Sequence, residues 1–236
     1  APPLLAPRTN RAPFRATPPG PRAVSGRDRS ATAGRDSAAK QLAARARSIG
    51  GWFAFEKDSV IGILAPNCPA VIEAHFAICW AGCVALNCNT RLAPTELAYI
   101  FQGSRCLGLI ADAQHSALVA SSVHDDMCKA LWLGSGASTF SSCTIQSQAD
   151  FETIASGAEN IVDSSDRVPR GSDAGAEMYY TSGTSGRPKG VVLSQRIVVL
   201  HALGCMIEQR LIAYDVRLHA APMSHLVDAY AIFAIT

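Results

Sequence analysis

The chain has 236 residues, of which 48% are apolar and 17% are charged, and its net charge is +2. This is a globular composition that can supply a hydrophobic core, and the near-neutral charge gives no sign of a general nucleic-acid partner. The longest nearly apolar run, residues 76–86, is too short to span a bilayer, so no transmembrane segment is predicted.

Residues 1–35 differ from the rest of the chain. They contain seven arginines and one acidic residue, Asp28, which gives 7 − 1 = +6, and they also hold seven of the 13 prolines. With few large apolar side chains to bury, this leader is predicted to be disordered. It is either a solvated tail or an organelle transit peptide, although the prolines would interrupt the amphipathic helix that such peptides form.

Strands and helices alternate from residue 36 onward. This alternation predicts an α/β fold in which a parallel sheet is covered by helices on both faces and ligands bind at the carboxyl ends of strands. Two polar connections, at residues 134–149 and 163–175, are predicted to be irregular. Helices are predicted at residues 36–49, 70–80, from Pro94 onward and at 115–123, and strands at 59–64, 83–87, 106–111 and 130–133.

The eight cysteines lie in apolar segments of a chain that is large enough to fold without disulfides. They are predicted to be buried thiols in a reducing compartment, either cytoplasmic or organellar. His75, Cys79 and Cys83 share one helical face, with Cys88 close behind, and could hold a soft metal. Because the segment is rich in small apolar residues and has no CxxC pair, a packed helix face is favoured and no metal site is predicted.

Residues 178–190, MYYTSGTSGRPKG, combine hydroxyl side chains, glycines and a lysine between two apolar strands, residues 176–180 and 191–193. Glycines let consecutive backbone N–H groups converge on an anion, while hydroxyls and a lysine add donors and charge. The alternative is a solvated glycine–serine linker, which the ordered flanks argue against. The predicted phosphate-binding residues are Thr181, Ser182, Gly183, Thr184, Ser185, Gly186 and Lys189.

After this loop, Ser194 stands where a helix N-cap belongs. The apolar pattern that follows predicts a helix over residues 195–212, and a short strand is predicted at residues 217–220. The apolar residues 231–235 are expected to lack packing partners within this chain. The apolar positions of the helical pattern are Ile197, Leu200, Leu203 and Ile207.

The loop resembles the phosphate-binding signature of the adenylate-forming superfamily. Residues 64–100, with an apolar helix, an AG turn and an NTRL segment, resemble the acyl-CoA synthetase branch rather than peptide-synthetase adenylation domains. The resemblance covers residues 36–236 and implies an incomplete N-terminal domain, with the small C-terminal domain absent.

The resemblance also implies a reaction. Members use ATP and Mg²⁺ to convert a carboxylic acid, here a fatty or aryl acid, to an acyl-adenylate, and then transfer the acyl group to CoA. The loop residues would hold the β and γ phosphates of ATP. No catalytic residue can be assigned within this chain, and the identity of the acid is not encoded in it.

His225 resembles the histidine of the family's PxxH segment, which lies near the acyl pocket and implies substrate binding. Ser224 and Asp228 depart from the family pattern, which has an aromatic residue and a glycine there, and Gln195 replaces a common histidine. The alternative is that His225 is a capping or surface residue.

Two hypotheses therefore stand. The chain is either the N-terminal portion of an acyl-CoA ligase or a non-catalytic remnant that at most binds nucleotide. In both cases the chain alone is expected not to turn over, since the residues that orient the carboxylate are expected beyond residue 236.

Overall fold

The computed structural model describes residues 29–134, 145–157, 171–181, 186–212, 215, 217–225 and 232–234, with side chains from residue 37 on. The first helix, α1 (Arg29–Phe53), begins inside the leader that was expected to be disordered and extends four residues beyond the predicted residue 49. The rest of that leader, residues 1–28, lies outside the described residues.

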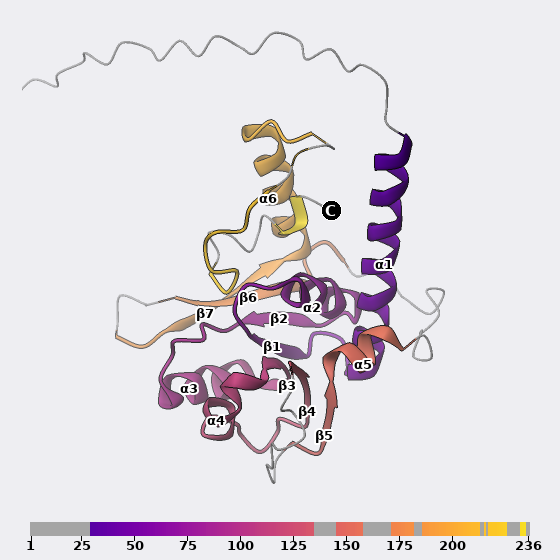
Figure 1. Cartoon of the computed structure of the whole chain (residues 1–236). Helices are drawn as coiled ribbons and strands as arrows, with labels where there is room; N and C mark the ends of the chain where they lie inside the picture. Colours follow the sequence, from indigo (N-terminus) through magenta and orange to yellow (C-terminus); the bar gives the residue numbers. More distant parts are fainter. Residues whose placement is uncertain are drawn as a thin grey trace, which may run out of the picture.

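The centre of the molecule is a sheet in which seven described strands lie in the order β5-β4-β3-β1-β2-β6-β7 (Figure 1). Neighbouring strands are parallel except for β7, which runs antiparallel to β6. The predicted α/β fold class is thus confirmed. The strands are β1 (Val60–Leu64), β2 (Val84–Asn87), β3 (Cys106–Asp112), β4 (Lys129–Leu133), β5 (Ser147–Asp150), β6 (Gly175–Thr181) and β7 (Lys189–Ser194).

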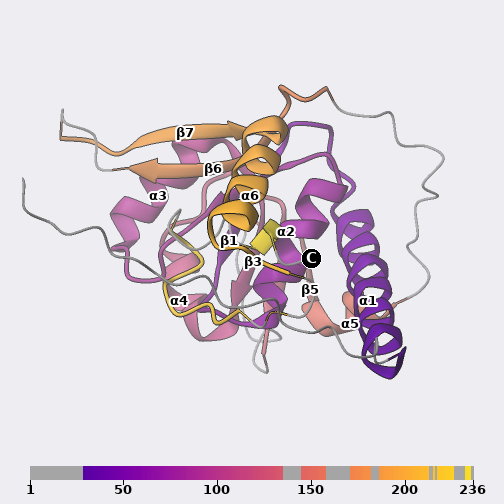
Figure 2. The same cartoon turned by 90° about the horizontal axis from the view of Figure 1, so that it is seen from above.

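Helices cover both faces of the sheet, and α1 and α2 lie side by side on one of them (Figure 2). One face packs against α1, α2 and α5, and the other against α3 and α4. None of the helices in the described ranges combines the length and the apolarity needed to cross a bilayer. The remaining helices are α2 (Pro69–Trp80), α3 (Pro94–Ser104), the 3₁₀ turn η1 (Ala113–His115), α4 (Ser116–Ala120), α5 (Phe151–Ser156), α6 (Gln195–Glu208) and the 3₁₀ turn η5 (Ile232–Ala234).

Two apolar clusters form the core, one on each face of the sheet. The first cluster includes Phe53 of α1, Ile78 of α2 and Ile61 of β1, and the second includes Phe101 of α3 and Trp132 of β4. Every residue of β1 is buried. A strand covered on both faces needs a continuous apolar run, and this is the reason that VIGIL does not alternate.

The first turn of α3 shows how local sequence sets an element. Pro94 occupies the first helical position, where no N–H is needed, and Glu96 Oε2 accepts a hydrogen bond from the Ala93 N–H at 2.8 Å. Arg105 ends the helix in the left-handed region with φ 53°. The predicted start of this helix is therefore confirmed.

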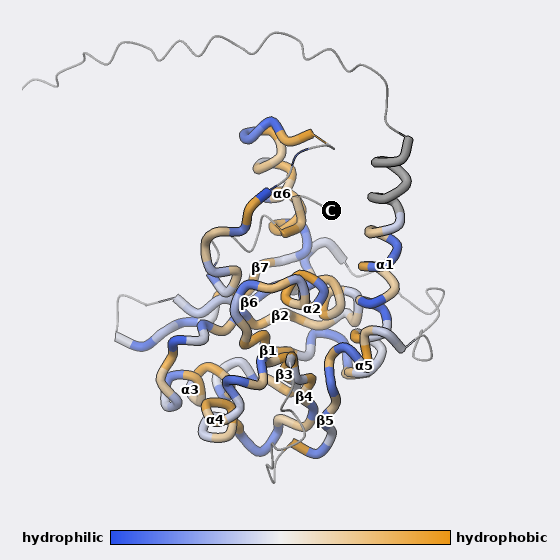
Figure 3. Tube along the Cα trace, in the orientation of Figure 1, coloured by the Kyte–Doolittle hydropathy of each residue, from blue (hydrophilic) through white to orange (hydrophobic). Residues whose placement is uncertain are grey.

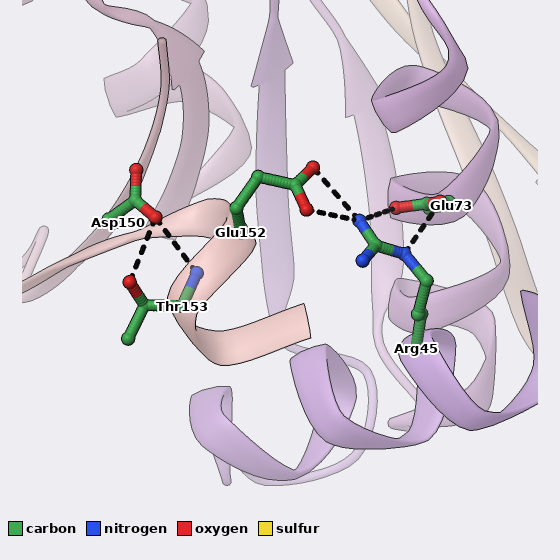
Figure 4. Close-up of polar contacts among 5 residues, drawn as sticks. All are labelled: Arg45, Glu73, Asp150, Glu152 and Thr153. Carbon is green, nitrogen blue, oxygen red and sulfur yellow. Dashed lines mark hydrogen bonds and ion pairs between the residues drawn. The ribbon is translucent and has the colours of Figure 1, made fainter. Parts of the chain in front are cut away.

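Arg45 ties three helices together on the α1 face (Figure 4). Its Nε and Nη2 donate to the two carboxylate oxygens of Glu73 on α2 at 2.8 and 2.9 Å, and Nη2 also reaches Glu152 of α5 at 2.9 Å. Asp150 caps α5 by accepting from the Thr153 N–H at 2.8 Å. The ion pair between Arg45 and Glu152 holds α5 beside α1 and α2.

Several predicted elements were wrong or missing. β5 and α5 lie partly in the segment predicted to be irregular, residues 134–149, and directly after it. The described residues 217–220 form no strand, and α6 ends at Glu208 rather than near residue 212. Ile232 and Ala234, expected to lack packing partners, are buried, and Ile232 joins the first core cluster.

Candidate functional site

The predicted phosphate loop connects β6 to β7 at the carboxyl end of β6. Thr181 ends β6 and Lys189 begins β7, and the two residues are cross-strand partners. Residues 182–185, which include four of the predicted site residues (Ser182, Gly183, Thr184 and Ser185), lie outside the described residues. The structure therefore brings together the two ends of the loop, at the sheet edge where α/β proteins bind ligands.

Two glycines of this segment stand where other residues would be strained or crowded. Gly186 has φ +92°, a conformation that glycine adopts without strain. A Cβ on Gly190 would lie 3.1 Å from the ring of Tyr180, so a larger residue there would require this ring to shift by a few tenths of an ångström. The backbone on the exit side of the loop is thus shaped by its glycines.

Tyr99 of α3 contacts the end of the loop that leads into β7. Its hydroxyl donates to the Pro188 carbonyl at 3.3 Å, and the guanidinium of Arg187 lies over its ring at 5.8 Å. The Tyr99 ring also meets Tyr180 edge to face, with the centroids 6.5 Å apart. These contacts fasten the segment before Lys189 to the body of the domain.

Lys189 and Lys129 have opposite environments. Lys129 Nζ donates to the carbonyls of Trp52 and Phe53 at 2.9 and 2.7 Å, where it caps the end of α1. Lys189 is exposed, and its ammonium group makes no hydrogen bond or ion pair with any described residue. Lys129 is therefore structural, whereas the ammonium group of Lys189, which has no partner among the described residues, lies beside a loop rich in donors, an arrangement that can bind phosphate.

His225 lies on a separate segment that Asn67 anchors at the start of α2. Asn67 Nδ2 donates to the carbonyls of His219 and Ala221 at 3.1 and 2.7 Å, and its Oδ1 accepts from the Met223 N–H at 2.7 Å. Met223 is buried in the first core cluster, while His225 itself is exposed. The anchoring role of Asn67 was not predicted, because its partners lie more than 150 positions away along the chain.

The described cysteines are all free thiols. Cys83, Cys88 and Cys106 are buried, and burial raises the pKa of Cys88 and raises that of Cys106 to about 12. The other four are half-buried, so the prediction of buried thiols is right for only part of the set, and Cys143 lies outside the described residues. Within the described ranges, no group of three His, Cys, Asp or Glu residues could hold a metal ion.

Sequence reasoning missed Glu177, which is buried in β6 four residues before Thr181. His75, considered above as a metal ligand, instead has its Nδ1 2.9 Å from Glu177 Oε1. The signal was an acidic residue within the otherwise apolar strand AEMYY.

Comparison with known families decides the membership of the chain. The family described as AMP-binding enzyme matches residues 16–236. The chain belongs to this family. The resemblance to adenylate-forming enzymes is therefore confirmed, and the fold matches the N-terminal domain of these enzymes.

Individual relatives agree with this membership. Peroxisomal benzoate–CoA ligase from Arabidopsis thaliana is 31% identical over 176 residues, which cover 72% of this chain and 30% of the relative. Long-chain-fatty-acid–CoA ligase from Thermus thermophilus is 31% identical over 157 residues, which cover 66% of this chain and 27% of that relative. The crystal structure of ATP-bound MatB from Rhodopseudomonas palustris has a similar fold, with a TM-score of 0.66 and 23% sequence identity. The match covers 82% of this chain and 37% of the MatB chain. The chain thus spans about a third of the length of such AMP-binding relatives.

Proposed function

We propose that this chain forms the ATP-phosphate-binding part of an enzyme that activates a carboxylic acid as an acyl-adenylate and transfers it to CoA. The observation that carries the proposal is the hairpin of β6 and β7, in which Thr181 and the exposed Lys189 are cross-strand partners at the two ends of the loop. Membership of the AMP-binding family supports it. The relatives named above supply aryl and fatty acids as the substrate classes to test.

In this proposal the chain's residues stabilise the negative charge of the ATP phosphates. As the α phosphate is attacked, negative charge grows on the leaving pyrophosphate, and donors fixed in advance at that position lower the barrier. Lys189 and the Thr181 hydroxyl would flank the β and γ phosphates, with residues 182–186 supplying further donors. Mg²⁺, when bound with ATP, would neutralise part of the phosphate charge.

His225 is proposed to border the acyl pocket. Asn67 fixes the backbone of its segment through three hydrogen bonds, so the position of the histidine is defined even though its side chain is exposed. The free thiols support a reducing compartment for the protein, either cytoplasmic or organellar.

The decisive experiment is Lys189→Ala in a form of the protein that continues beyond Thr236. Pyrophosphate exchange should fall about 10²- to 10³-fold, as it does when one preorganised transition-state donor is removed. Lys57→Ala is the matched control, because Lys57 is also exposed but precedes β1. An exchange rate unchanged by Lys189→Ala would refute the assignment of the loop.

For the 236-residue chain alone we propose weak binding of ATP without turnover. The phosphate site supplies affinity, but orientation of the carboxylate for in-line attack carries much of the rate. Multiple turnovers of ATP to AMP and pyrophosphate by this chain, dependent on an added fatty or aryl acid, would contradict this view.

A further inference from the structure

Three polar side chains form a buried chain of contacts where α2 lies against β6. His75, Glu177 and Tyr179 are all buried. The Nδ1 atom of His75 lies 2.9 Å from Glu177 Oε1, and the Tyr179 hydroxyl donates to Glu177 Oε2 at 2.5 Å. Each carboxylate oxygen of Glu177 therefore has its own partner.

The direction of the Tyr179 hydrogen bond follows from its surroundings. Burial, and next the negative charge of Glu177, raise the pKa of Tyr179, so its hydroxyl stays protonated and acts as the donor. The contact between His75 Nδ1 and Glu177 Oε1 is a hydrogen bond with one proton between the two atoms. Phe233 of η5 packs edge to face on the His75 ring, with the centroids 6.1 Å apart.

Such a network is not needed to stabilise a sheet. A buried carboxylate loses its hydration, and replacing a buried ionic group with well-packed apolar residues is often neutral or stabilising. The face of β6 opposite Glu177 carries Met178 and Tyr180, which pack against the second apolar cluster. A shift of β6 by one residue would place Glu177 in that apolar cluster without a partner, so the network selects one register.

The register of β6 determines where the phosphate loop begins. Side chains alternate along a strand, so Glu177, Tyr179 and Thr181 share one face. On one side β6 pairs with β2 at Ala85 and Glu177, and on the other Thr181 pairs with Lys189. Fixing the side chains at 177 and 179 therefore fixes the residue from which the loop leaves the sheet.

We propose that Glu177, held by Tyr179 and His75, is a positioning residue for the phosphate site. It locks β6 in the register that sets Thr181 and Lys189 opposite each other across the loop. Glu177 acts through the strand and not by touching the nucleotide. The inference rests on the proposed function of the loop.

A variant in which all three polar groups are replaced separates positioning from stability. His75→Leu, Glu177→Leu and Tyr179→Phe together remove the network without leaving an unpartnered buried group. Its thermal midpoint should equal or exceed that of the parent chain. Titration of the 236-residue chain with MgATP, followed by ligand-observed NMR, should nevertheless show binding at least about tenfold weaker.

Two single variants sharpen the test. Glu177→Gln keeps the shape and can still accept from Tyr179, so its MgATP affinity should stay within about threefold of the parent. Tyr179→Phe removes only the hydroxyl and should weaken binding roughly three- to tenfold. Ser122→Ala is the matched control, because it removes a buried hydroxyl that donates to the carbonyls of Pro94 and Leu118, on the opposite face of the sheet.

The outcomes are distinct. Parent-like MgATP affinity in a folded triple variant, or in Tyr179→Phe if the triple variant does not fold, overturns the positioning role. Glu177→Gln binding as weakly as the triple variant also overturns it, because charge and not register would then matter. Lys189→Ala in the same titration tests the loop itself: no loss of affinity there refutes the proposed function, whereas loss there together with a parent-like folded triple variant refutes only this inference.

Discussion

Strands β1 and β7 belong to one sheet but have opposite environments. All five residues of β1 are buried, whereas four of the six residues of β7 are exposed. The same contrast separates α2, which is buried in the first core cluster, from α6, in which only Val198 and Ala202 are buried. Figure 3 shows apolar colours along much of α6, which rises above the sheet.

The contrast shows that an apolar pattern predicts a helix or strand without predicting what covers it. The β1 to β5 part of the sheet has helices on both faces and closes its own core. The β7–α6 surface presents apolar side chains outward, and a contiguous surface of this kind favours association with other polypeptide. Its exposed members are Val191, Val192, Ile197, Val199, Leu200, Leu203, Met206 and Ile207.

The largest expected effect is in the closed part of the sheet. Trp132 is fully buried, and its Nε1 donates to Gln148 Oε1 at 2.9 Å. Trp132→Ala should lower the free energy of unfolding by about 3–5 kcal/mol. Leu200→Ala on α6, where the side chain is 60% exposed, should change it by no more than about 0.5 kcal/mol. Urea unfolding followed by circular dichroism measures both, and similar losses would contradict the division into two regions.

The next largest effect is expected from alkaline pH, which should lower the free energy of unfolding through buried Cys106 of β3 in the closed part of the sheet. Burial raises the pKa of Cys106 to about 12 from its ordinary value of 9.0, so the folded state resists ionisation that the unfolded state accepts. The contribution is constant below pH 9, and stability falls as pH rises from 9 toward 12, by about 1.4 kcal/mol per pH unit for this group. Cys106→Ala should flatten the pH dependence of the free energy of unfolding by that amount.

The elements predicted correctly are those whose sequence carries its own local reason. Pro94 and Glu96 mark the start of α3, and Ser194 caps α6 by accepting from the Ile197 N–H at 3.4 Å. Strand β5, with the sequence SQAD, has no apolar run or β-branched residue and is a strand because it pairs with β4. Tertiary pairing of this kind leaves no mark in a local pattern.

The same distinction applies to the candidate site. The chemistry of the loop could be predicted, because hydroxyls, glycines and Lys189 are adjacent in the chain. The contact between His75 and Glu177 could not, since it joins residues 102 positions apart. Asn67 likewise reaches residues more than 150 positions away. Contacts that position a site arise from the fold, whereas the groups that touch a ligand are often grouped in one segment.

Ion pairs in the two regions should differ by a smaller amount. Arg45→Ala leaves the part-buried Glu73 without its guanidinium partner and should cost roughly 1–3 kcal/mol of unfolding free energy. Arg196→Ala removes the exposed pair with Asp173 beside α6 and should cost less than about 1 kcal/mol. Thermal unfolding of both variants, with Arg45→Lys as the conservative control, makes the comparison. Equal losses would show that the two pairs are equally screened by solvent.

The smallest change in stability, and the clearest change in behaviour, is expected from charge on α6. Leu200 and Ile207 lie seven residues apart on one helical face and are 60% and 75% exposed. Replacing both with Lys should alter the free energy of unfolding by no more than about 0.5 kcal/mol, because neither side chain packs into the core. The double substitution should nevertheless reduce self-association of the chain, because it places two charges among the exposed apolar side chains of α6. Sedimentation velocity over a range of protein concentrations measures this, and Glu208→Lys, which adds positive charge at the end of the same helix, controls for charge alone. Self-association that persists in the double variant would place the contact surface elsewhere, and a large loss of stability would mean that this face of α6 is packed within the folded chain.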